Sequence, residues 1–212
     1  RSSGVNTTRF CPETNDACGR KQLKVLLAAR LLKEKGIREF SEAAIAVKRR
    51  GHDIEFLLAG TPDPGNPHSI ARNEVEQWHE QGTLRWLGHV DDMPALMRSV
   101  DVMVLPSYYR EGVPRSLIEA AASGLALVTT DLPGCREVVT QDGIDGLHVK
   151  PRDAESLADA LIMLDNDPGL LRRLGLRARQ RALTDFDERL VIDKTMQVYS
   201  ELLHLTSAMV AK

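Results

Sequence analysis

Short apolar runs alternate with stretches of helical spacing through most of this chain, and this alternation limits the fold more than any other feature. Residues 24–29 (KVLLAA) form a nearly continuous apolar run, as expected for a parallel strand covered on both faces. Residues 36–50 then carry apolar side chains at helical spacing, and Gly51 ends that pattern. Repetition of this pair predicts an α/β fold, a parallel sheet of about six strands with helices on both faces. The predicted strands are 24–29, 54–59, 84–87, 101–105, 125–130 and 146–149, and the helices between them are 36–50, 66–81, 93–99 and 114–123.

The two ends of the chain differ from this alternation. Residues 1–22 are polar, contain glycine and proline and show no apolar period, which indicates an interdomain linker or strap. The sheet domain is predicted at 23–183, and a C-terminal crossover helix, long enough to reach a neighbouring domain, at 184–212. Three helical patterns follow the last strand with no strand between them: 153–165, 168–183 and 186–205.

The charge balance and the low aromatic content argue against nucleic acid as a partner. The 28 basic and 30 acidic side chains leave a formal net charge of −2, and aromatic residues make up 4%. No apolar run approaches the roughly 18 residues that span a bilayer, and the first residues lack the apolar core of a signal peptide. We therefore expect a cytoplasmic protein. An arginine-rich helix face is either a solvated surface or a peripheral contact with the inner face of the cytoplasmic membrane; it comprises Arg172, Arg173, Arg177, Arg179 and Arg181.

Cysteine and histidine positions give no metal-ligand spacing. Cys11, Cys18 and Cys135 are odd in number and include no C-x-x-C pair, which indicates free thiols in a reducing compartment. The six histidines are spread along the chain and likewise show no metal-ligand spacing. We expect neither a metal nor a bound cofactor.

Ligands of open parallel sheets bind beyond the carboxyl ends of the strands, so residues just after each strand are the candidates. Arg30 and Lys35 follow the first strand, and Gly36 permits a tight turn before the helix. A planar guanidinium and an ammonium group at this edge can hold a diphosphate. Solvated arginine and lysine also occur near turns, so this pair alone does not define a function.

A second polar cluster follows the strand at 101–105. Glu111 lies in the loop, Glu119 lies inside the next helix, and the amides of Gly112 and Val113 lie at or just before its start. Helix N-termini bind anions, and carboxylates accept hydrogen bonds from sugar hydroxyls. The alternative is that Glu119 is an exposed helix carboxylate and Glu111 a surface charge that complements the helix dipole.

Five motifs, in this order, resemble the family 4 retaining glycosyltransferases of GT-B architecture. They are A-x-R-L-L-K-E-K-G, L-G-H-V-D-D, P-S-Y-Y-R-E-G-V-P-R-S-L-I-E-A, T-D-L-P-G-C-R-E-V-V and D-G-x-D-G-L-x-V. Within the family, P-S-Y-x-R-E-G-x-P-R and G-C-R-E-V-V look most like the bacterial capsule, O-antigen and lipid-linked-oligosaccharide branch. The resemblance runs from about Gly4 to the last helix and implies a Rossmann-like domain that is one half of a GT-B fold.

The resemblance implies catalytic roles for three residues. Arg30 and Lys35 match the pair that binds the donor diphosphate and stabilises it as the leaving group. Glu111 matches the first glutamate of the family's E-x7-E motif, which contacts the hydroxyls of the donor sugar.

Four further residues match donor-binding positions of the family. Glu119 matches the second glutamate, which binds the ribose hydroxyls. Gly112 and Val113 match positions whose amides approach the donor, and Val90 matches the position that lines the base pocket. Such enzymes usually need no bound metal, because cations and a helix end supply the positive charge.

The chain contains one sheet domain, whereas the family has two, with the acceptor site on the N-terminal one. The opening Gly4-Val5-Asn6 resembles the junction between them, and Ala29 stands where the family usually has glycine. We therefore expect a donor-binding domain, inactive alone because transfer needs both substrates in one cleft. Its partners would be its own N-terminal domain, a nucleotide sugar and an acceptor.

The expected reaction is transfer of a hexose-type sugar to a saccharide or lipid-linked acceptor in cell-envelope polysaccharide synthesis, with a UDP-sugar preferred as donor. Two alternatives remain open at this point. One is a related enzyme, a nucleotide-sugar epimerase or a sucrose-synthase-like protein. The other is a binding module that kept the fold and lost catalysis.

Overall fold

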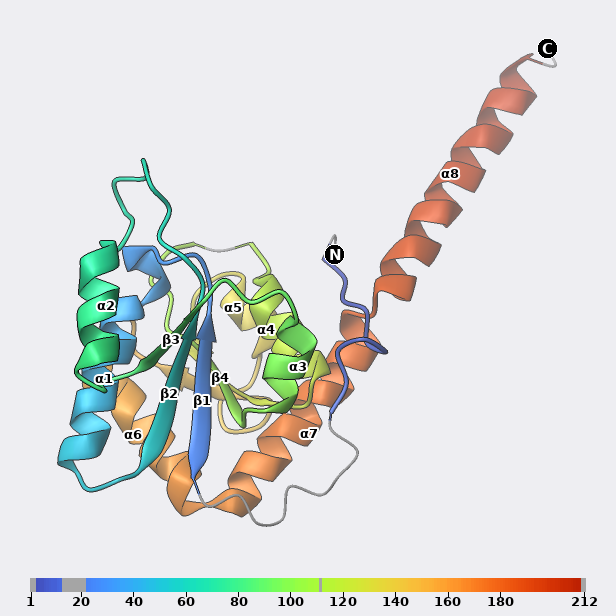
Figure 1. Cartoon of the computed structure of the whole chain (residues 1–212). Coiled ribbons are helices and arrows are strands. Elements are labelled where there is room, and N and C mark those ends of the chain that lie inside the picture. The colour runs from blue at the N-terminus through green and yellow to red at the C-terminus, as the bar shows by residue number, and fades with distance from the viewer. Residues whose placement is uncertain (1–2, 13–21, 111, 211–212) are drawn as a thin grey trace.

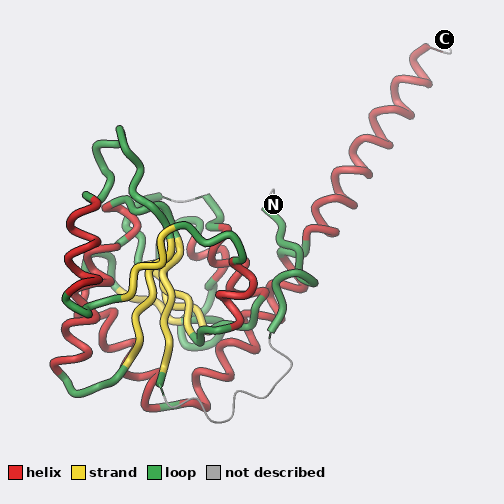
Figure 2. Tube along the Cα trace, viewed as in Figure 1, coloured by secondary structure: helices red, strands yellow, loops and turns green. Residues whose placement is uncertain are grey.

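A parallel sheet of six strands forms the centre of the molecule (Figures 1 and 2). The computed structural model describes residues 3–12, 22–110 and 112–210, and only the backbone from 201 onward. The strand order is β3-β2-β1-β4-β5-β6, and every neighbouring pair is parallel. The predicted α/β fold is therefore confirmed. The strands are β1 (Leu23–Ala28), β2 (Ile54–Ala59), β3 (Arg85–Gly88), β4 (Val102–Leu105), β5 (Ala126–Thr130) and β6 (Leu147–Val149).

The continuous apolar runs of the strands feed two separate hydrophobic cores. Successive side chains of a strand point to opposite faces of the sheet, so a strand buried on both sides must be apolar throughout. In β1, Val25 and Leu27 belong to the first core, whereas Leu26 and Ala28 belong to the second. The run that predicted a strand covered on both faces therefore has one apolar set for each face.

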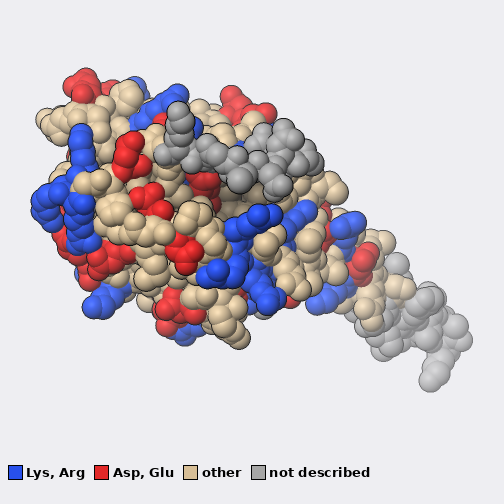
Figure 3. Space-filling model, turned by 90° about the horizontal axis from the view of Figure 1, so that it is seen from below, with Lys and Arg blue, Asp and Glu red and all other residues tan. Residues whose placement is uncertain are grey.

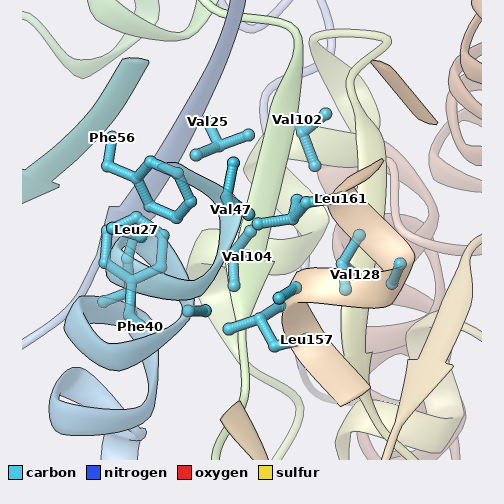
Figure 4. Packing of buried hydrophobic residues seen from close by; sticks show 14 of the residues in the cluster. Val25, Leu27, Phe40, Val47, Phe56, Val102, Val104, Val128, Leu157 and Leu161 are labelled. Carbon is cyan, nitrogen blue, oxygen red and sulfur yellow. The ribbon is translucent and has the colours of Figure 1, made fainter. Parts of the chain in front are cut away.

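Helices α1, α2 and α6 cover the first core, and α3, α4, α5 and α7 cover the second. Figure 4 shows part of the first core, where the rings of Phe40 and Phe56 lie with centroids 5.0 Å apart and Leu157 and Leu161 of α6 face the sheet. Burial of such side chains supplies about 1.5–3 kcal/mol each, which makes these two layers the main source of stability. The helices are α1 (Ile37–Arg49), α2 (Arg72–Glu80), α3 (Met93–Arg98), α4 (Arg115–Ala122), α5 (Cys135–Val138), α6 (Ala154–Asn166), α7 (Pro168–Asp185) and α8 (Glu188–Val210), with a 3-10 turn η1 (Lys33–Lys35).

Helix α2 begins at Arg72, whereas the sequence pattern predicts a start at 66. The residues before it pair with the segment that leaves β1. The His68 carbonyl accepts a hydrogen bond from the Lys33 N–H at 2.9 Å, and the Ile70 N–H donates to the Leu31 carbonyl at 2.8 Å. These backbone groups are used in a contact between distant segments, so they do not enter a helix.

The N-terminal segment is fastened to the junction of α7 and α8. Buried Val5 forms a parallel bridge with Asp187, donates its N–H to the Phe186 carbonyl at 2.8 Å and accepts from the Glu188 N–H at 3.0 Å. The Thr7 hydroxyl donates to the Asp187 carboxylate at 2.5 Å. Beyond this junction α8 projects away from the sheet (Figure 1).

Two arginines of the predicted basic face are structural, which corrects the interpretation of that face as a single surface. Arg179 donates hydrogen bonds to backbone carbonyls of the N-terminal segment and of α4. Arg181 donates to the buried Asp145 carboxylate at 3.0 Å and to Asp185 at 3.1 Å. Figure 3 shows basic side chains gathered in a patch on the face seen from below, with acidic side chains beside it. The arginines that stay exposed are Arg172, Arg173 and Arg177.

Two kinds of feature are absent from the described residues. Among them, no helix is long and apolar enough to cross a bilayer, and no cluster of three or more histidine, cysteine, aspartate or glutamate side chains is placed to hold a metal ion. Cys11 and Cys135 are thiols, and Cys18 lies outside the described residues.

Candidate functional site

The topological switch of the sheet lies between β1 and β4, which are neighbours in the sheet but distant in the sequence. The chain leaves β1 toward α1 on one face and leaves β4 toward α4 on the other. The two connecting segments therefore diverge at the carboxyl edge of the sheet, where open α/β sheets bind their ligands. Arg30 and Lys35 lie on the first of these segments, and Gly112 and Val113 lie on the second.

The segment after β1 carries the two predicted cations. Arg30 has a side chain that is 68% exposed and forms an ion pair with Asp63 at 3.1 Å. Lys35 ends the 3-10 turn, half-buried, and Gly36 follows it in the left-handed region with φ of 76°. This turn keeps the cations at the sheet edge before α1 begins.

The same turn packs on the segment after β4. A β-carbon built on Gly36 would lie 2.5 Å from the Pro106 carbonyl oxygen, so the approach requires glycine. The Glu34 carbonyl accepts hydrogen bonds from the Ser107 hydroxyl at 2.9 Å and from the Tyr108 N–H at 3.0 Å. The segments that carry the two clusters are thus joined by direct contacts at the switch point.

Helix α4 begins at this edge without a side-chain cap. Arg115 is its first residue, and Pro114 occupies the N-cap position. Before it, Gly112 is exposed, with no atom within 4 Å of the place of a β-carbon, and Val113 packs half-buried on the second core. Uncapped N–H groups and the helix dipole favour an anion at such an end. Glu111 lies outside the described residues.

Glu119 lies inside α4 and is largely withdrawn from solvent, with 16% of its side chain exposed. Its carboxylate accepts a hydrogen bond from Arg115, one turn earlier, at 3.4 Å. Burial raises the pKa of this carboxyl group, and the charges of Arg115 and Arg9 only partly oppose the shift. A carboxylate in this setting gains more from hydrogen-bond donors brought by a ligand than an exposed one does.

Val90 follows β3 and therefore lies further along the carboxyl edge, beyond β2 from the switch point. Its side chain is half-buried and packs on the second core. His89 beside it is exposed and lies 3.2 Å from the Asp91 carboxylate. The position predicted to line a base pocket is thus on the same edge as the other site residues but on a different segment.

Two contacts at this edge escape sequence reasoning. Asp63, in the loop after β2, pairs with Arg30, and its position after a strand was the available signal. Arg152, after β6, lies with its guanidinium carbon 4.4 Å from the centroid of the Tyr108 ring. No sequence pattern signals this second contact, because β6 and β4 are distant in the chain.

Comparison with known proteins is consistent across sequence and structure. The family model "Glycosyl transferases group 1" matches residues 22–167. A relative from Campylobacter jejuni, N,N'-diacetylbacillosaminyl-diphospho-undecaprenol alpha-1,3-N-acetylgalactosaminyltransferase, is 32% identical over 96% of this chain and 54% of its own length. The chain thus spans about half the length of the curated relatives it matches.

Solved structures share the fold. The Anabaena protein Alr3699/HepE, solved in complex with UDP, superposes with a TM-score of 0.81 at 20% identity, over 93% of this chain and 56% of that one. The C-terminal domain of a glycosyl transferase group 1 protein (LpcC) from Francisella tularensis has a TM-score of 0.73 at 27% identity, over 87% of this chain and 99% of that one. The fold, the order of the motifs and a family match over most of the chain agree, and the chain belongs to the group 1 glycosyl transferases.

Proposed function

We propose that this chain is the donor-binding half of a retaining glycosyltransferase and that it binds a UDP-sugar at the switch point between β1 and β4. The observation that carries the proposal is the packing of Gly36 and Glu34 on residues 106–108. In this proposal, that packing brings two cations, an uncapped helix end and the partly buried Glu119 carboxylate to one site. Together they offer positive groups for a diphosphate and an acceptor for sugar hydroxyls.

The diphosphate would lie between Arg30, Lys35 and the first turn of α4. When the bond to the sugar breaks, negative charge grows on the leaving nucleoside diphosphate, and fixed cations and helix amides stabilise it. Among the described residues, Arg30 is paired with one carboxylate, that of Asp63, and a diphosphate can replace this contact. These groups supply the charge that a metal ion supplies elsewhere, so we propose a reaction without a metal.

The nucleoside and the sugar would lie on either side of this diphosphate. Glu119 would accept hydrogen bonds from the ribose hydroxyls, and Val90 would line the pocket of the base. Glu111, outside the described residues, would contact the donor sugar. Support for uracil as the base comes from the UDP complex of the Anabaena structure, which shares this fold.

The acceptor would be a saccharide or a lipid-linked saccharide used in cell-envelope polysaccharide synthesis. The name of the Campylobacter relative includes an undecaprenol-linked diphosphate, and a second relative, from Staphylococcus aureus, is a capsular polysaccharide biosynthesis glycosyltransferase. Peripheral contact with the membrane would follow from such an acceptor. We propose that the N-terminal domain of the complete enzyme binds it, so the chain alone binds the donor without transfer.

Calorimetric titration of the chain with UDP and with GDP tests this function. Arg30→Ala should weaken UDP binding at least about tenfold, the effect of losing one charge-assisted contact. Arg85→Ala is the matched control, because Arg85 has a similarly exposed side chain, paired with Glu55, at the opposite edge of the sheet. Wild-type binding to neither nucleotide at millimolar concentration, or equal losses in both variants, would reject the proposed site.

A further inference from the structure

One arginine at the carboxyl edge has an unusual backbone conformation. Arg152, which follows β6, has φ of 58° and is the one non-glycine residue in the left-handed region within the described part of the chain. That conformation brings the β-carbon of an L-residue close to the following carbonyl oxygen, so a side chain is kept there only when its surroundings fix it.

The Arg152 side chain contacts the Tyr108 ring. The guanidinium lies over the Tyr108 ring, 4.4 Å from its centroid, in the arrangement of a cation–π contact. Glu39, in the first turn of α1, attracts the same guanidinium. One carboxylate oxygen of Glu39 is buried without a hydrogen-bond partner among the described residues, and burial raises the pKa of this group.

Tyr108 belongs to the segment that leads from β4 to the start of α4. Its backbone N–H is held by Glu34 on one side. On the other side, the Thr130 hydroxyl donates to the Ser107 carbonyl at 2.6 Å. Arg152 adds a third contact, to the Tyr108 side chain. It follows β6, whereas Glu34 follows β1 and Thr130 ends β5. Ser107 and Tyr108 are thus held by residues that follow or belong to β1, β5 and β6.

We propose that Arg152 is a positioning residue for residues 106–110, which lead toward the α4 end of the donor site. The Arg152 guanidinium holds the Tyr108 ring, a contact we call the clamp, and thereby keeps the start of α4 and the turn of Arg30 in position relative to each other. Donor affinity therefore depends on Arg152, although Arg152 itself does not bind the diphosphate. The inference deepens the proposed function and rests on it for the donor, whereas the clamp itself is a property of the free chain.

Arg152→Gly tests the clamp, because glycine adopts φ of 58° without strain and removes the guanidinium. The amides of Tyr108, Tyr109 and Arg110 should exchange with deuterium about three to ten times faster, the range of one partly exposed cation–π contact. The melting temperature should stay the same or rise. A merely structural role would instead lower the melting temperature and speed exchange throughout the sheet.

Two further variants make the result specific. Arg49→Ala, at an exposed arginine that lines the same surface hollow as Arg152, should leave loop exchange unchanged. Tyr108→Leu should reproduce the effect of Arg152→Gly, and combining them should add nothing further, since both remove one contact. Unchanged exchange in Arg152→Gly, or additive effects in the double variant, would overturn the clamp.

Titration with UDP then separates the clamp from the proposed function. Arg152→Gly should weaken UDP binding about three- to tenfold, in step with the faster exchange. Faster exchange with unchanged UDP affinity would overturn the positioning role. If the wild-type chain binds neither UDP nor GDP, but Arg152→Gly still speeds amide exchange at Tyr108, Tyr109 and Arg110, the proposed function fails while the clamp is supported.

Discussion

Replacing Glu119 by glutamine separates the two consequences of its burial. The change removes the negative charge and keeps the shape and one acceptor oxygen. In the free chain 16% of the Glu119 side chain is exposed, and within the described residues its carboxylate accepts one long hydrogen bond, from Arg115 at 3.4 Å. A ligand hydroxyl would find an acceptor whose charge is poorly solvated and only partly compensated.

The expected loss of UDP affinity follows from that environment. Hydrogen bonds to a charged group are worth about 1.5–3 kcal/mol, so Glu119→Gln should weaken UDP binding roughly 10- to 150-fold. The thermal stability of the free chain should instead stay the same or increase. Because burial raises the pKa of Glu119, its contribution to stability is fully present below the pKa of the unfolded chain and is lost as pH rises through the folded pKa. At neutral pH the uncharged variant should therefore melt at the same or a higher temperature.

Calorimetry with UDP and thermal unfolding at two pH values measure both effects. Glu76→Gln is the control, since Glu76 also pairs with an arginine four residues away on its helix but has 45% of its side chain exposed, on α2. It should change neither affinity nor melting temperature noticeably. Unchanged UDP affinity in Glu119→Gln, or a melting temperature several degrees lower at neutral pH, would refute the reasoning.

Three further predictions concern the scaffold. Gly36→Ala should destabilise the chain by about 2–5 kcal/mol in urea unfolding, because it puts a side chain in the left-handed region and also makes it clash with Pro106. Gly82→Ala is the control, because its β-carbon meets open space and it carries only the cost of the left-handed conformation, about 1–2 kcal/mol. Equal losses of stability in the two variants would contradict the close approach of Gly36 to Pro106. Asp145→Asn should make the melting temperature fall less steeply below about pH 4. Burial raises the pKa of Asp145, but hydrogen bonds and the nearby Arg181 outweigh burial and leave the pKa low, so the stability that the charged carboxylate contributes is lost on acidification. Identical acid profiles of variant and wild type would contradict this. Leu27→Ala should cost about 2–5 kcal/mol by leaving a cavity in the first core, and a loss below about 1 kcal/mol would show that the core collapses around it.

Most of the strands were predictable because each lies in a short, mostly apolar run of the sequence. The run 24–29 corresponds to β1 at Leu23–Ala28, and 125–130 corresponds to β5 at Ala126–Thr130. Both runs are buried on two faces, so the pattern and the structure express the same physical requirement. Candidate site residues could be proposed because parallel strands place their carboxyl ends at one edge, which made the residues after each strand the ones to examine.

The features that sequence reasoning missed depend on contacts between distant segments. The late start of α2 results from pairing of His68 and Ile70 with the segment after β1. The structural role of Arg181 depends on Asp145, 36 residues earlier in the chain, and a spacing of arginines on a helix cannot distinguish it from a solvated charge. Helix α5 has four residues, which is too short for an apolar period to show.

The bridge between Val5 and Asp187 gives two distant stretches of chain a common pivot. The Val5 N–H donates to the carbonyl of Phe186, at the end of α7, and the Val5 carbonyl accepts from the N–H of Glu188, the first residue of α8. The N-terminal segment and α8 therefore rotate together unless these hydrogen bonds break. Helix α8 has 23 residues and is therefore a lever of about 35 Å. A tilt of about 10° at the pivot displaces its far end by about 6 Å at that length. Because Val5 and Phe186 are both buried in the second core, such a tilt acts on the N-terminal segment and on that core together.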